Sequence, residues 1–196
     1  MENVIGTPGS RRAPMRQGIT EELGKTRLRA LNDVNRRLEK AMGKSTFVYV
    51  TYIRTTAERL WAALTDAETI KQYWFGVDCD SRWTPGSSWQ MVYPDGRITD
   101  TGEIVEAEPP RRLMIRWQHQ DQPELKAEGE SYCAMDLQSC GPVVKLSITH
   151  IIERDPSKFL AAVSGAWPQC ISNLKSLLET GSAALQDHFP VEAAHS

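Results

Sequence analysis

The sequence predicts an α+β fold, in which an antiparallel sheet buries one face against a long C-terminal helix. Three observations support this prediction. The middle of the chain holds short stretches of alternating apolar and polar residues separated by turn signals. Two short helical segments follow the first of these stretches. Residues 155–181 then place apolar side chains at spacings of three and four, which indicates one face of a helix.

The composition is that of a globular protein with about one domain and an extension. The chain has 196 residues, of which 40% are hydrophobic and 24% charged. No apolar run approaches the roughly 18 residues of a membrane span, and the N-terminus lacks the apolar segment of a secretory signal. We therefore expect a cytoplasmic protein without a membrane span.

The charge is unevenly distributed along the chain. Residues 1–44 hold ten Lys or Arg and five Asp or Glu, whereas residues 45–196 hold 13 and 20. The acidic body makes nucleic acid an unlikely partner. The cysteines form no Cys-x-x-Cys pair, so we expect buried thiols in a reducing compartment, with no metal and no cofactor: Cys79, Cys133, Cys140 and Cys170.

The N-terminal region divides into two parts. Residues 1–18 are rich in Gly, Pro and Arg, which predicts a disordered leader. Residues 19–44 predict a basic amphipathic helical extension. This extension is interpreted as solvated or docked on the body. The alternatives are a dimerisation helix, a membrane-surface helix or the remnant of a DNA-binding module. Its narrow apolar stripe would suit a homodimer contact.

The predicted body, residues 45–181, begins with a strand at 46–54 that is rich in β-branched and aromatic residues. Thr56 and Asp66 are expected to cap two short helices, one over 57–65 and one reaching about Trp74. A short extended segment follows at 77–79. Alternation and turn signals such as Pro94-Asp95-Gly96 then predict five strands, at 88–93, 97–106, 112–119, 128–137 and 143–152.

The C-terminal helix is expected to begin with Asp155 as its cap and Pro156 in its first turn, and to end at Gly181. Pro168, with Gly165 close before it, predicts a kink or a break near Ala166. Residues 182–196 are expected to form a flexible tail.

Several segments together resemble the activator of heat-shock-protein-90 ATPase homologue-like family, a branch of the SRPBCC or START-like helix-grip superfamily. The segments are TYIR at 51–54, YWFG at 73–76, GEIVEA at 102–107, LSITH at 146–150 and LKSLLETG at 174–181. The likeness spans about residues 46–181, although Ala166 stands where the family more often has Gly. It implies a curved antiparallel sheet of about six to seven strands gripping the long helix, with a cavity between them.

The candidate ligand-binding residues are aromatic and apolar side chains at inward-facing positions, which could equally fill the core. They are Trp74, Phe75, Trp89, Met91, Trp117, Met135, Ile148, His150, Trp167 and Ile171. His150 is interpreted first as a structural histidine and second as a general base or ligand contact. Asp100 and His119 are expected to be solvated.

The predicted function is the binding of a small hydrophobic or amphipathic ligand in that internal cavity, with a stress-related or regulatory role. One alternative is a co-chaperone-like interaction module. The other is an enzyme resembling polyketide cyclases or aromatases, with His150 or Tyr93 as acid or base. The sequence lacks a nucleophile elbow, a phosphate loop and paired metal-binding histidines. This favours a non-catalytic role without excluding catalysis by residues far apart in sequence.

Overall fold

The structure, a computed structural model, describes residues 43–187. The predicted leader and almost all of the helical extension lie outside the described residues, as does most of the predicted tail. The described chain runs as follows: β1 (Ser45–Ile53), α2 (Ala57–Thr65), α3 (Ala67–Tyr73), β2 (Asp78–Ser81), β3 (Ser88–Val92), β4 (Ile98–Glu108), β5 (Arg112–His119), α4 (Pro123–Lys126), β6 (Ser131–Cys140), β7 (Val143–Ile152) and α5 (Lys158–Thr180).

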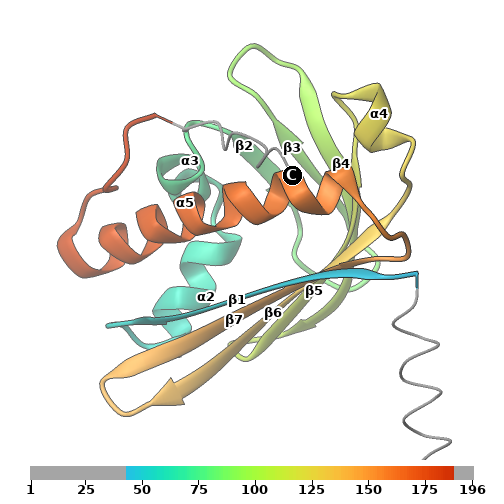
Figure 1. Cartoon of the computed structure of the whole chain (residues 1–196). Coiled ribbons are helices and arrows are strands. Elements are labelled where there is room, and N and C mark those ends of the chain that lie inside the picture. Colours follow the sequence, from blue (N-terminus) through green and yellow to red (C-terminus); the bar gives the residue numbers. More distant parts are fainter. Residues whose placement is uncertain (1–42, 188–196) are drawn as a thin grey trace, which may run out of the picture. The chain divides into compact units, whose positions relative to one another are not determined.

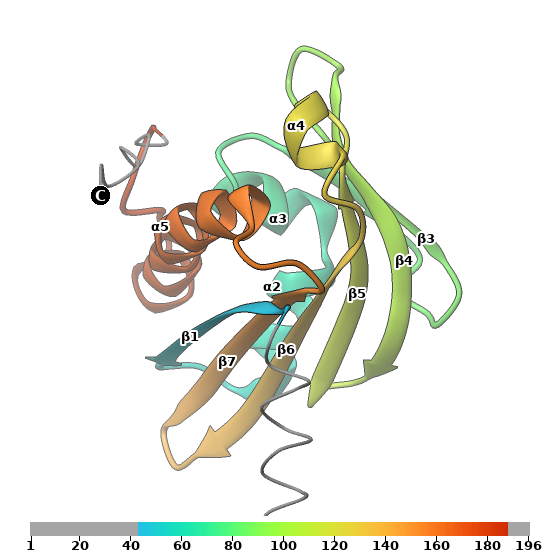
Figure 2. The same ribbon diagram turned by 45° about the vertical axis from the view of Figure 1, so that its right-hand side comes forward.

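The seven strands form one antiparallel sheet in the order β1-β7-β6-β5-β4-β3-β2. Figures 1 and 2 show the sheet curving around α5, with α2 and α3 beside the helix. Two register shifts, at Met91/Val92 and between Ile104 and Glu106, help to bend the sheet because a bulge increases local twist. The predicted fold class is thereby confirmed.

Gly102 in β4 permits a close approach of the neighbouring strand. It pairs with Trp89 on β3 and with Trp117 on β5. A Cβ atom at this position would lie 1.8 Å from the carbonyl oxygen of Arg116. The absence of a side chain therefore lets β4 and β5 approach closely beside the two indole rings, whose centroids are 4.4 Å apart.

The helix caps are partly as predicted. Thr56 and Asp66 accept hydrogen bonds at the starts of α2 and α3. The predicted start of α5 is wrong, because Ser157 caps the helix and Asp155 lies before it, where its carboxylate accepts a hydrogen bond from Ser45. The carboxylate of Glu128 reinforces this start by accepting bonds from the Ser157 hydroxyl and from the amides of residues 158 and 159.

Of the kink or break predicted near Ala166, the break is absent, because α5 runs without interruption through Pro168. Proline removes one helical amide and costs about 3 kcal/mol in a helix interior. In the turn that contains the proline, the side-chain amide of Gln169 donates a hydrogen bond to the backbone carbonyl of Gly165 at 3.1 Å. Trp167 and Ile171 lie fully in the core on either side of the proline, and this packing outweighs its penalty.

Candidate ligand-binding site

A cavity of about 530 Å³ lies between the first half of α5, the segment after α3, and the ends of β4 and β5. This volume is typical of a small-molecule site. Its walls are mostly apolar, with polar groups gathered among them. The lining residues are Trp74, Phe75, Val77, Tyr93, Asp100, Trp117, His119, Gln122, Leu125, Phe159, Ala162, Val163, Ala166, Cys170, Gln186 and Asp187.

The space deeper between helix and sheet is filled. The void there measures about 20 Å³, room for about one water molecule. Aromatic packing closes it, since the indole of Trp74 meets that of Trp167 edge-on at 5.0 Å. Trp74 and Trp117 contact both spaces, so the same tryptophans complete the core and form a wall of the open cavity.

The structure divides the ten residues proposed from the sequence into three groups. The large cavity is lined by Trp74, Phe75 and Trp117. The small void is lined, in addition to Trp74 and Trp117, by Trp89, Met91, Met135 and Trp167. The core holds Ile148, His150 and Ile171, which line neither space.

His150 is a buried and fully hydrogen-bonded histidine. The indole N–H of Trp167 donates to its Nδ1 at 3.3 Å, so the proton of the neutral ring belongs on Nε2, which donates to Ser131 Oγ at 2.9 Å. The Ser131 hydroxyl in turn donates to the carbonyl of Trp117. Burial lowers the pKa of His150 to about 4. This ring therefore has no free nitrogen for a ligand or a substrate.

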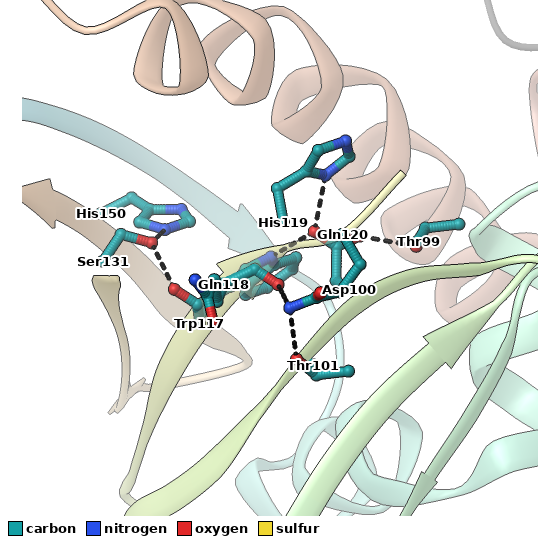
Figure 3. Close-up of polar contacts among 9 residues, drawn as sticks. All are labelled: Thr99, Asp100, Thr101, Trp117, Gln118, His119, Gln120, Ser131 and His150. Carbon is teal, nitrogen blue, oxygen red and sulfur yellow. Dashed lines mark hydrogen bonds and ion pairs between the residues drawn. The ribbon is translucent and has the colours of Figure 1, made fainter. Parts of the chain in front are cut away.

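Asp100 and His119 are not solvated, contrary to the expectation from the sequence. Asp100 is 8% exposed, and its Oδ1 accepts from Nε1 of Trp117 at 2.7 Å and pairs with Nδ1 of His119 at 2.9 Å. Its Oδ2 accepts from the Thr99 hydroxyl at 2.6 Å. Figure 3 shows these side chains converging from neighbouring strands. The sequence of β5 held a pattern that predicts an inward-facing His119, because the alternation of inward-facing residues through Trp117 continues to residue 119.

The carboxylate of Asp100 fixes the tautomer of the neutral His119 ring. A carboxylate only accepts hydrogen bonds, so Nδ1 of His119 carries the proton of the neutral ring and Nε2 keeps its lone pair. Nε2 is buried and has no hydrogen-bond partner among the described residues. In its neutral form His119 thus presents an acceptor that no described residue satisfies, and the sequence analysis missed it.

Tyr93 adds a hydroxyl to the polar part of the wall. Burial raises its pKa, and the nearby carboxylates of Asp100 and Asp121 raise it further, so the phenol stays protonated at neutral pH. Within residues 43–187, no group of three or more His, Cys, Asp or Glu side chains could hold a metal ion. None of the described helices is long and apolar enough to cross a bilayer.

Comparison with known proteins identifies both sequence and structural relatives. The family described as "Activator of Hsp90 ATPase homolog 1-like protein" matches residues 54–179. Among curated proteins, no match was found.

Solved structures agree on the fold. Protein MLL2253 from Mesorhizobium loti is 22% identical, with a TM-score of 0.61, over 69% of this chain and 97% of that chain. The Aha1 dimer from Colwellia psychrerythraea is 20% identical, with a TM-score of 0.58, over 70% and 98%. PFC0360w, an HSP90 activator from Plasmodium falciparum, is 20% identical, with a TM-score of 0.56, over 68% and 95%.

Proposed function

The chain belongs to the activator of Hsp90 ATPase homolog 1-like family, and we propose that this member binds a small amphipathic molecule in the cavity beside α5. The observation that carries the proposal is the cavity itself, about 530 Å³ with mostly apolar walls. Burying about 300 Å² of apolar ligand surface at about 25 cal/mol per Å² gains about 7 kcal/mol. The losses of association reduce this gain, so we expect dissociation constants above about 10 μM.

The proposal is for binding without catalysis. His150, which with Tyr93 was a predicted acid or base, has both ring nitrogens occupied. An acid–base role would fall instead to His119, whose Nε2 has no partner among the described residues. The cytoplasmic location remains part of the proposal and is supported by four free thiols, which suit a reducing compartment. A stress-related or regulatory role would follow from the ligand once it is known.

A co-chaperone-like role is the second candidate, and the similarity to an HSP90 activator favours it. Self-association would fit this role, since the similar Aha1 structure is a dimer. A co-chaperone-like role and self-association do not require a cavity of this size. We therefore place ligand binding first. The second candidate would be favoured if a chaperone co-purified with the parent protein and co-purified equally well with a variant whose cavity is filled by a larger side chain.

Filling the cavity tests the proposal. Ala166 lies on the wall formed by α5, whereas Ala161 on the same helix is exposed and is not part of the wall. We expect 1-aminoanthracene, a neutral polycyclic probe, to fluoresce on binding to the parent and to Ala161→Phe. Ala166→Phe should weaken binding at least tenfold, because the new ring occupies the site. Equal binding by all three proteins would place the probe elsewhere and overturn the proposal.

A further inference from the structure

Among the described residues, the charged side chains in the cavity wall are all acidic. The charged residues in its wall are Asp100 and Asp187, and no lysine or arginine belongs to the wall within the described chain. Arg97 lies close by, with its guanidinium 5.1 Å from the centre of the Tyr93 ring. It is already paired with Asp95 and Asp121, each at 2.8 Å. Within residues 43–187, an anionic ligand would therefore find no unpaired cation at this wall.

The polar groups of the wall are arranged to accept hydrogen bonds. Asp100 is an acceptor held by Trp117, Thr99 and His119. His119 offers the lone pair of Nε2, which has no partner within residues 43–187. A buried acceptor without a donor destabilises the folded state. A ligand that donates a hydrogen bond to it would recover part of this free energy.

Reaching Nε2 requires a small movement of the wall, since this atom is itself shielded from solvent. The ring of His119 lies 6.2 Å from that of Phe159, another wall residue on α5. The Asp100 carboxylate anchors the other side of the imidazole and keeps its tautomer fixed during such a movement.

From these observations we infer that the cavity selects a ligand whose polar group donates a hydrogen bond and carries no negative charge, such as a phenol or an amine. The inference rests on the proposed function and narrows it. A carboxylate in the same place would lose its water beside Asp100 and would meet no unpaired cation among the described residues. An ether in place of the hydroxyl would leave Nε2 of His119 unsatisfied.

Three probes with one carbon skeleton test the selection: 2-naphthol, 2-methoxynaphthalene and 2-naphthoate, titrated calorimetrically at pH 7 against the parent chain. We expect 2-naphthol to bind at least tenfold more tightly than either of the others. Equal affinities for all three, or tightest binding of 2-naphthoate, would overturn donor selection while leaving cavity binding intact. No binding by any probe would overturn both proposals.

Two variants test whether His119 and Asp100 are the residues that select a hydrogen-bond donor. His119→Phe keeps an aromatic ring and removes the acceptor, so 2-naphthol should lose its advantage over 2-methoxynaphthalene while the affinity for the ether changes less than threefold. Asp100→Asn removes the charge, and we expect tighter binding of 2-naphthoate. Circular dichroism and thermal melting check that each variant folds. The probe series on the parent decides the proposal even if a variant does not fold.

Discussion

Trp167 donates its indole N–H to Nδ1 of His150 across 3.3 Å, where α5 meets the sheet. This bond assigns the tautomer of a histidine that is 0% exposed. It also connects the C-terminal helix to β7 and, through Ser131, to β5. His150 thus contributes to the fold as a neutral polar link between helix and sheet, and its burial predicts that the stability of the protein depends on pH.

Stability should fall as His150 becomes protonated in the unfolded chain. Its pKa is lowered by burial from 6.5 to about 4. Between these values the unfolded chain binds a proton that the folded protein does not, so the contribution is present above about pH 6.5 and lost towards pH 4. At pH 5 the loss is about 2 kcal/mol. Urea unfolding at pH 7.5 and pH 5 measures it.

The control for this prediction is His150→Asn, which stays uncharged. Other groups titrate alike in both proteins, so the parent should lose about 2 kcal/mol more than the variant between the two pH values. Equal losses would show that His150 does not carry the dependence.

Removal of the Glu128 carboxylate should loosen the start of α5. Burial by itself would raise the pKa of Glu128, but hydrogen bonds from Ser157, Lys158 and Phe159 lower it overall. The ionised form therefore supports the helix, and this support is lost as the pH falls below the usual range of a carboxyl. We expect Glu128→Ala to reduce the free energy of unfolding by about 2 kcal/mol. Glu124→Ala, which removes only an exposed ion pair, should change it little.

Gly102→Ala tests the close approach of β4 and β5. The new methyl group would overlap the backbone carbonyl of Arg116, which cannot move without disturbing the strand pair. We expect a loss of about 3 kcal/mol in unfolding free energy. Gly129→Ala is the comparison, because it meets nothing within 4 Å and suffers only from its φ of +91°; its loss should be nearer about 1 kcal/mol. Similar losses would contradict the packing argument.

The sheet and its order of elements were predictable because burial imposes a period of two on strands such as β5. The start of α5 was not, since Glu128, which supports it, lies 30 residues before Lys158. Continuity through Pro168 likewise depends on tertiary packing. Asp100 and His119 were assigned to solvent as polar residues, and only the pairing of β4 with β5 places them opposite each other. The cavity volume depends on how side chains from several elements fit together, which no local pattern encodes.

The most direct test of ligand binding beside α5 is a ¹H–¹⁵N spectrum of the tryptophan indoles during titration with 2-naphthol. The chain has six tryptophans, whose indole N–H groups can each give a signal. Trp74 and Trp117 line the cavity, and the indole N–H of Trp117 is bonded to Asp100, whereas Trp61 on α2 lines neither space. We predict saturable shifts of the Trp74 and Trp117 signals with that of Trp61 unmoved. A saturable shift confined to Trp61, or none at all, would contradict the account.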